Sequence, residues 1–336
     1  MPELDFVWRD GERLVRFRSG AAAEAREALT GAGFGRYALL TTERARRSVP
    51  ELAEGAGVVL EVPPGRVDEL SAQLLGQVGS RSPVALGGGR VIDVAKAIAG
   101  AGEGRCAAIP TTLSGAEMTG FHRLPAGVSG AHSVRPALVV ADPELMASQP
   151  APGLAATAMN AMAHAMEALY TPLANPVGDM AALRGAELIA RHLPDAEPDR
   201  GRLALGALLA GYASGAAGLA VHHAVCQTVV RVAGSPHAET NAVMLPHFAA
   251  LMASRAPEAM GRLARALGDP HEDPEGAAGL LSKLAARSGH TRLSTLGVEE
   301  EQLPKIASLA REHRGVAITP DPPGEDELEA LLRAAL

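Results

Sequence analysis

The residues with the clearest chemical potential are imidazoles in the second half of the chain. Asn160 and His164 lie four positions apart in an apolar run, and His223 and Gln227 repeat this spacing. Positions four apart share one face of a helix, so each pair can point to the same side. His237 precedes a further apolar segment. Imidazoles that converge in an apolar setting can bind a divalent metal or hold and protonate a small substrate.

Two of these positions carry amides. Asn160 offers a neutral oxygen where a metal site favours a carboxylate, which weakens the binding of a divalent ion. Gln227 can neither donate nor accept a proton near neutral pH as an imidazole can. A lone histidine on an apolar helix is usually a core or surface group, but three in one helical region predict a common polar pocket, and metal binding is a narrower hypothesis.

A glycine-rich turn in the first half could bind phosphate. Gly87, Gly88 and Gly89 follow a predicted strand and precede a predicted helix that contains Asp93 and Lys96. Glycines let the backbone approach a pyrophosphate, and the free N–H groups of a helix start favour negative charge. An ordinary tight turn between strand and helix would look similar. Because the chain has only three lysines, a lysine here indicates a role that arginine cannot fill.

A second loop, at residues 109–119, also follows a predicted strand. Its hydroxyl groups, among them Thr111 and Thr112, can form hydrogen bonds with phosphate or ribose. The alternative is a simple helix cap by Thr111 or Ser114. Alone, this segment carries little information about function.

The elements that position these residues differ between the two halves. Residues 1–145 alternate short β-branched runs with amphipathic stretches, which predicts a mostly parallel sheet covered by helices on both faces. The predicted strands are 37–41, 58–62, 84–86, 107–109 and 137–141, and the helices between them include 21–32, 66–78 and 93–99.

The pattern changes at the proline-rich and glycine-containing stretch 149–153. Beyond it the chain shows almost no strand signal. The predicted helices are 154–169, 177–192, 202–219, 221–232, 238–253, 257–266, 274–287, 303–313 and 325–335. We therefore expect an α/β nucleotide-binding domain over 1–150 and an all-α domain over 151–336 that carries the substrate or metal site.

Bulk properties narrow the function. A chain of 336 residues exceeds the usual single-core domain, so two domains are expected. A formal net charge of -7 argues against nucleic acid as a partner. Cys106 and Cys226 are the only cysteines, which favours the reducing cytoplasm over a disulfide framework. No apolar run reaches the roughly 20 residues of a membrane span, so the expected partner is a small molecule.

These motifs resemble those of the iron-containing alcohol dehydrogenase family, within the dehydroquinate-synthase-like superfamily, and most of all its maleylacetate reductase branch. The segments that carry the resemblance are GGGRVIDVAKAIA at 87–99, IPTTLSGAEMT at 109–119, ADPEL at 141–145, MNAMAHAMEALYTPLANPV at 159–177, HHAVCQ at 222–227, SPHAETNAVMLPH at 235–247 and APEAMGRLARALG at 256–268. The resemblance implies an α/β domain followed by an all-helical one, with NAD(P)H in the cleft between them, and a homodimer.

The resemblance also implies roles for single residues. The pyrophosphate and ribose would be held by Gly87, Gly88, Gly89 and Asp93, and the nucleotide would be lined by Thr111 and Thr112. The iron or zinc ligands of metal-dependent relatives fall on Asn160, His164, His223 and His237. A further histidine that faces the nicotinamide in those relatives falls on Gln227. Asparagine at position 160 is shared with the maleylacetate reductase branch.

The cofactor preference rests on the end of the first predicted parallel strand. Many NAD-preferring relatives have an acid there, and this chain has Thr42, followed by Arg44, Arg46 and Arg47. A missing carboxylate and nearby guanidinium groups accommodate a 2′-phosphate, which favours NADPH slightly over NADH. The alternative is a solvated basic helix start.

Three functional hypotheses follow. The first is an NAD(P)H-dependent reductase that delivers hydride to an activated C=C or C=O of a small anionic substrate. In this hypothesis His164, His223 and His237 orient the substrate or supply the proton, and Arg123 binds its anionic group. The reaction can proceed without a metal. The second is a non-redox dehydratase, cyclase or silent binder on the same fold, suggested by Gln227 and Arg90. The third is a metal-dependent alcohol dehydrogenase with zinc or iron.

Overall fold

The computed structural model describes residues 4–102 and 104–336. The chain divides into two compact units, residues 1–148 and residues 149–336. Each unit has its own arrangement of secondary structure and is described by itself.

The first unit contains a seven-stranded sheet in the order β1-β2-β7-β6-β5-β3-β4. Every neighbouring pair is parallel except β1 and β2. This confirms the predicted mostly parallel sheet. The strands are β1 Phe6–Asp10, β2 Arg13–Phe17, β3 Ala38–Thr41, β4 Val58–Glu61, β5 Pro83–Gly87, β6 Ala107–Pro110 and β7 Leu138–Ala141.

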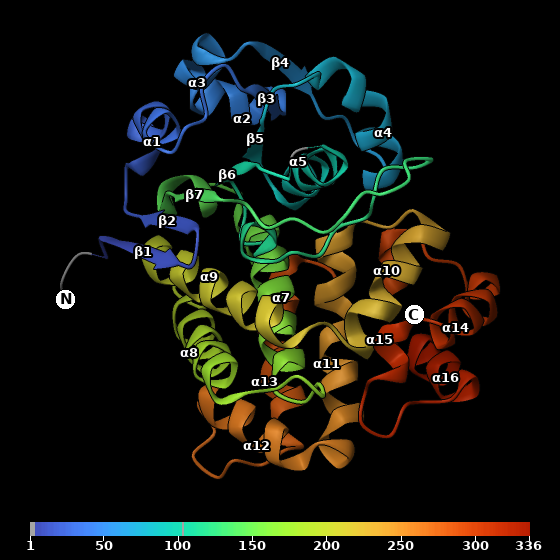
Figure 1. Cartoon of the computed structure of the whole chain (residues 1–336). Helices are drawn as coiled ribbons and strands as arrows, with labels where there is room; N and C mark the ends of the chain where they lie inside the picture. Colours follow the sequence, from blue (N-terminus) through green and yellow to red (C-terminus); the bar gives the residue numbers. More distant parts are fainter. Residues whose placement is uncertain (1–3, 103) are drawn as a thin grey trace. The chain divides into compact units, whose positions relative to one another are not determined.

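Helices cover both faces of this sheet. Alternate side chains along a strand point to opposite faces, so Leu39 and Leu86 lie in one buried cluster and Leu40 and Ala85 in another. The first cluster includes α1–α3 and the second includes α4 and α5 (Figure 1). The helices are α1 Ala25–Gly31, α2 Glu43–Ser48, α3 Pro50–Gly55, α4 Val67–Val78, α5 Gly89–Ala101 and α6 Pro143–Met146.

Strands β1 and β2 are elements that the sequence analysis missed. They form an antiparallel hairpin across Gly11, whose φ of 61° is a backbone conformation that glycine adopts easily. Along β2, buried and half-buried residues alternate strictly. Charged residues within both strands obscured this period-two pattern, although a two-residue connection that begins with glycine, here Gly11 and Glu12, is a hairpin signal.

The order of the strands defines a switch point in the sheet. The chain passes from β3 to β4 on one side of β3, then returns to β5 on the other side and continues to β6 and β7. In open α/β sheets, ligands bind outside the carboxyl ends of the two strands that flank such a point. Here these ends are Thr41 of β3 and Gly87 of β5. The two strands are parallel neighbours, and Thr41 pairs with Leu86.

Among its described residues, the second unit contains helices and no strand. Helix α7 is almost wholly buried and contacts α8, α9, α11 and α13. The larger helices are α7 Ala151–Ala168, α8 Pro176–His192, α9 Arg200–Ala217, α10 Val221–Ala233, α11 His237–Arg255, α12 Pro257–Ala266, α13 Gly276–Ala285, α14 Leu303–Arg311 and α16 Glu325–Ala335, with the short α15 Arg314–Ala317. All nine predicted helices have a counterpart.

One predicted boundary was wrong by several residues. The stretch 149–153 was expected to break the chain, but α7 begins at Ala151 and includes Pro152 in its first turn. Proline is tolerated there because the first N–H groups of a helix have no partner within the helix.

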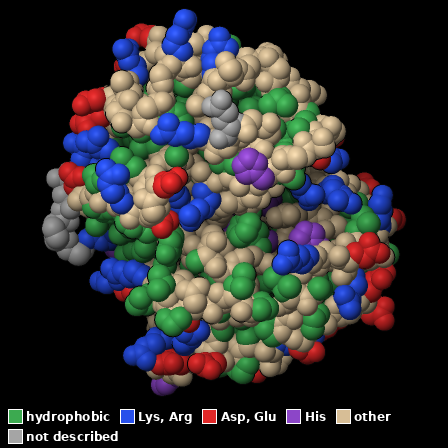
Figure 2. Space-filling view, in the orientation of Figure 1, with side chains coloured by type: hydrophobic (Ala, Val, Ile, Leu, Met, Phe, Trp, Pro, Cys, Tyr) green, Lys and Arg blue, Asp and Glu red, His purple; other side chains and the backbone are tan. Residues whose placement is uncertain are grey.

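The surface shown in Figure 2 carries Lys and Arg side chains interspersed with Asp and Glu. Within the described part of the chain, no single helix has both the length and the apolar composition of a membrane span. The helices α9 and α10 pass such a test only as a pair, with a bend of 101° between them.

Candidate functional site

The glycine turn lies at the switch point and is closely packed. Gly88 is the N-cap of α5 and has no side chain with which to cap it. Its φ of -80° and ψ of -174° are open to any residue, so backbone strain does not explain the glycine. A Cβ at Gly88 would instead lie 2.9 Å from Cγ2 of Thr112, and one at Gly89 would lie 3.1 Å from Cβ and Oγ of Ser114. The 111–114 loop thus packs against Gly88 and Gly89, whereas a Cβ at Gly87 would lie 2.7 Å from Cβ and Cγ2 of Val91.

The two loops predicted to bind the nucleotide therefore form one structure. The N–H of Thr111 donates to the carbonyl oxygen of Gly87 at 3.0 Å. This bond ties Thr111 to Gly87, the last residue of β5, and the Thr112 side chain packs against Gly88 at the start of α5. Thr42 lies beyond the neighbouring strand and caps α2, because its Oγ1 accepts the N–H of Ala45 at 3.3 Å.

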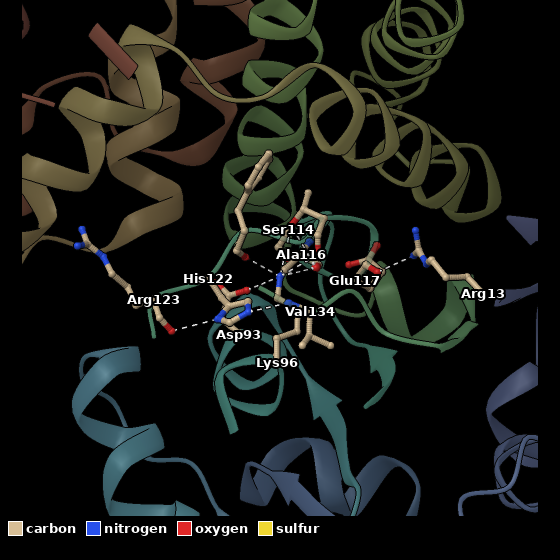
Figure 3. Close-up of polar contacts among 11 residues, drawn as sticks. Arg13, Asp93, Lys96, Ser114, Ala116, Glu117, His122, Arg123 and Val134 are labelled. Carbon is tan, nitrogen blue, oxygen red and sulfur yellow. Dashed lines mark hydrogen bonds and ion pairs between the residues drawn. The ribbon is translucent and has the colours of Figure 1, made fainter. Parts of the chain in front are cut away.

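Lys96 is fully buried, and its ammonium group lies among oxygen atoms of the following loop (Figure 3). Nζ donates to the carbonyl oxygens of Ala116 and Phe121 at 2.9 and 2.7 Å, and it also reaches both oxygens of Thr119. Asp93 forms an ion pair with it at 2.8 Å. These contacts tie Lys96 to the loop beside the glycine turn, and the predicted role of Lys96 in cofactor binding stays a prediction.

Glu117 is a second buried charge in this loop that sequence reasoning missed. Neither of its carboxylate oxygens has a hydrogen-bond partner among the described residues. Arg13, also buried, donates to the backbone oxygen of Glu117 at 2.9 Å. Burial raises the pKa of Glu117 to about 7, against the lowering effect of Lys96 and Arg13. The signal in the sequence was a lone acid in a loop of small and hydroxyl-bearing residues.

The buried carboxyl of Glu117 leads to a pH-dependent prediction. Its pKa is about 7 in the folded chain, above the ordinary 4.5, so the stability it contributes is complete below pH 4.5 and is lost as the pH rises through 7. We compare the free energy of unfolding of Glu117→Gln with that of the wild type. The difference should favour the variant more at pH 8 than at pH 5, by roughly 2 kcal/mol. Urea unfolding at both pH values measures this. A difference between the two proteins that does not change with pH would contradict it.

In the second unit, the central contact of the imidazole group is between His223 on α10 and Glu167 on α7. Nδ1 of His223 lies 2.6 Å from Oε2 of Glu167, and the backbone N–H of His223 donates to Oε1 at 3.1 Å. Glu167 is fully buried. Burial raises its pKa, whereas His222 and the backbone N–H groups at the start of α10 lower it.

Two further imidazoles surround this pair. The rings of His164 and His223 stack with centroids 4.6 Å apart and planes 16° from parallel. His222 packs edge-on against His223, and its Nε2 lies 3.3 Å from the carbonyl oxygen of Asn241. Burial lowers the pKa of both His222 and His223 to about 3, so both are neutral near physiological pH.

His237 differs from these because it is exposed at the start of α11. Nδ2 of Asn241 lies 3.3 Å from its Nε2. His237 is nevertheless near enough to lower the pKa of His222 and His223 electrostatically. Of the two amides, Asn160 is buried and Gln227 is half-buried. The predicted residues thus divide into a buried group and one accessible imidazole.

Comparison with known proteins identifies the family. Residues 16–150 match the iron-containing alcohol dehydrogenase model, and residues 154–336 match the Fe-containing alcohol dehydrogenase family, C-terminal model. The chain belongs to the iron-containing alcohol dehydrogenase family. It is an NAD(P)-dependent oxidoreductase, as its family membership indicates.

Individual relatives in the family cover nearly the whole chain. Maleylacetate reductase 1 of Rhodococcus opacus is 33% identical over 92% of this chain and 90% of its own length. Maleylacetate reductase of Sphingobium indicum is 34% identical, over 91% of each chain. The crystal structure of maleylacetate reductase from Agrobacterium tumefaciens superposes with a TM-score of 0.83 at 29% identity, covering 100% of this chain and 98% of that one.

The metal set that the family resemblance implies does not fit the imidazoles as they lie. A metal ion binds a ring nitrogen close to the plane of the ring. The rings of His164 and His223 are stacked with nearly parallel planes. The two planes therefore intersect only far from both rings, and one ion cannot lie in both planes close to the nitrogens. Among the described His, Cys, Asp and Glu residues, a group whose ligand atoms lie within 4.8 Å of one another is instead formed by Glu167, His222 and His223. By distance that group could hold an ion, but Glu167 and His223 already bond to each other.

Glu167 is the main residue of this site that the sequence analysis missed. It follows His164 by three positions, so both lie on one face of α7. A single acid within an apolar helix was the available signal. Its partner is 56 positions away on α10, and no local pattern links the two.

Proposed function

We propose that this protein is a maleylacetate-reductase-like enzyme, which passes hydride from NAD(P)H to an activated C=C or C=O of a small anionic substrate. The observation that carries the proposal is the full-length similarity to maleylacetate reductases, in a chain that places a glycine turn at the switch point of its sheet. The proposed nucleotide contacts come from the first unit, and the proposed proton donor comes from the second. No step is assigned to a metal.

The proposed nucleotide contacts follow from the geometry of the first unit. The N–H groups at the start of α5, a helix of 13 residues, favour the negative pyrophosphate beside Gly87, Gly88 and Gly89. Asp93, Thr111 and Thr112 would complete this set, while Lys96 would act through the loop that it holds. Thr42, at the neighbouring strand end, would lie near the adenine ribose.

For a C=C conjugated to a carbonyl group, the reaction balances in two steps. Bound NAD(P)H would supply hydride to the carbon remote from the carbonyl, and the electron pair of the C=C would move to form an enolate. A proton then converts the enolate to the saturated product, and NAD(P)⁺ is released. We assign this proton to His237, because it is the accessible imidazole of the predicted set. His164, His223 and Gln227 would line the substrate, with Arg123 as a cation for its carboxylate.

Replacement of His237 tests the assigned proton donor. His237→Ala should lower kcat by about 10²–10⁴-fold, the usual contribution of general acid catalysis, with little change in affinity for the nucleotide. Steady-state kinetics across pH measures this, and His271→Ala is the control because His271 is exposed outside the predicted site. Unchanged kcat in His237→Ala would remove His237 from the mechanism.

The proposed preference for NADPH rests on the arginines of α2. All three are exposed; Arg44 donates to the carbonyl oxygen of Ser148 at 3.2 Å, and Arg47 forms an ion pair with Glu43. We expect Arg44→Ala combined with Arg46→Ala to raise KM for NADPH by about 10-fold and to leave KM for NADH nearly unchanged. Equal effects on both cofactors would contradict a role in binding the 2′-phosphate.

The direct test of the function is oxidation of NADPH or NADH by the purified protein with maleylacetate as acceptor, followed by nicotinamide absorbance. We expect turnover without added metal. Tight nucleotide binding without oxidation of the nicotinamide during product formation would instead support the non-redox hypothesis. If calorimetry detects no nucleotide binding, the reductase proposal is wrong.

We also propose a homodimer, which the resemblance implies. Strand β1 lies at the edge of the sheet, and in the described structure its only strand partner is β2. Val7 on this strand is 60% exposed. An edge strand with an exposed apolar side chain is suited to pairing with a second copy of the chain.

A further inference from the structure

The carboxylate of Glu167 lies where a helix needs an anion. Helix α10 has Ala220 at its N-cap and therefore no side-chain cap of its own. Oε1 of Glu167 accepts the third backbone N–H of that helix, from His223, at 3.1 Å. A helix start stabilises the ionised form of a carboxyl group, because its N–H groups carry partial positive charge. Glu167 thus caps α10 from α7.

The second oxygen of Glu167 determines where the proton lies on His223. An ionised carboxylate can only accept hydrogen bonds. When Glu167 is ionised, as its position at the start of α10 favours, the 2.6 Å contact between Oε2 and Nδ1 of His223 requires that Nδ1 carry the proton and donate it. In a neutral imidazole, the other nitrogen then presents a lone pair.

That other nitrogen faces no partner of its own. Nε2 of His223 is buried, and none of the described residues forms a hydrogen bond with it. A buried acceptor left unmatched costs free energy, which is usual where a site awaits a ligand. The ligand that matches a lone pair is a hydrogen-bond donor, such as a hydroxyl group.

We propose that Glu167 is a positioning residue that fixes His223 as the Nδ1–H tautomer, so that Nε2 accepts a hydrogen bond from a donor group of the bound ligand. The proposal deepens the function proposed above and rests on it only for the identity of the substrate. It implies that His223 does not clamp a carboxylate, since two acceptors repel each other. Anion binding then falls to other groups.

The tautomer can be measured without turnover. In protein labelled with ¹⁵N at histidine, two-bond proton–nitrogen spectra distinguish a protonated ring nitrogen from one with a lone pair, and His223→Gln identifies the signals. We expect His223 to show Nδ1 protonated and Nε2 bare in the wild type. A wild-type spectrum with Nε2 protonated would overturn the proposal.

Two glutamine variants separate positioning from general stability. In Glu167→Gln the amide can either donate to His223 or accept from it, so we expect the single-tautomer pattern of His223 to be lost. If the reductase function holds, we also expect kcat to fall by about 10–100-fold. Glu187→Gln makes the same change on an exposed residue of α8, 42% exposed at its side chain, and should alter neither. An unchanged His223 tautomer in a folded Glu167→Gln protein contradicts the proposal. If that variant does not fold, the wild-type tautomer still decides.

This design keeps the two proposals distinct. If no reductase activity is found but His223 shows the Nδ1–H tautomer that is lost in Glu167→Gln, the positioning role stands and the proposed reaction fails. If activity is found but the tautomer is Nε2–H, the reaction stands and the role of Glu167 fails.

Discussion

Lys96→Met should destabilise the first unit by roughly 3 kcal/mol, the scale for removing one partner of a buried ion pair. Methionine has a similar length but cannot donate, so the carbonyl oxygens of Ala116, Thr119 and Phe121 and the Asp93 carboxylate lose their common cation. Each buried acceptor left unsatisfied adds a cost. Urea unfolding gives the free energy, and hydrogen exchange over residues 111–121 locates the loss.

Two further substitutions make this result specific. Lys283→Met is the matched control, because Lys283 is exposed on α13 and should tolerate the change. Lys96→Arg should recover little stability, since a planar guanidinium does not fit the oxygens arranged around a compact ammonium. Equal stability of Lys96→Met and the wild type would show that these contacts contribute nothing to the loop.

The second large effect is expected at the glycine turn. Gly88→Val should weaken nucleotide binding by at least about 10-fold, because its Cβ would lie 2.9 Å from Cγ2 of Thr112 and push apart the two loops that form the proposed site. Isothermal titration with NADPH measures the affinity. The matched control is Gly31→Ala, where no atom lies within 4 Å of the added Cβ.

A double substitution shows whether this contact is the cause. Thr112→Ser removes the Cγ2 methyl and keeps the hydroxyl, so it should partly restore binding in a Gly88→Ala background. Additive losses in the double variant would mean that Gly88 matters through direct contact with the nucleotide, and not through the fit between the two loops.

The fold was predictable where a local pattern carries the information. The nine long helices of the second half follow from apolar periodicity, and helices 257–266 and 325–335 match the observed bounds. The β1–β2 hairpin was missed because charged residues within both strands interrupted its apolar pattern. The start of α7 was misplaced because proline within a first turn resembles a linker.

The site was predictable as a list of residues but not as a set of contacts. Periodicity brought His164 and His223 together as candidates, and their rings do stack. It could not show that stacking prevents the two rings from sharing an ion, because ring orientation depends on packing. Nor could spacing reveal the Glu167–His223 pair, which forms only when two helices distant in the sequence pack together.

The double use of the Glu167 carboxylate limits how this enzyme can change. One oxygen supports the end of a helix and the other governs an imidazole. Evolution or a protein engineer cannot retune the basicity of that ring at position 167 without also loosening the helix that presents it. Mutational drift toward new chemistry should therefore begin at accessible positions such as His237, where side chains can be exchanged without loss of the scaffold.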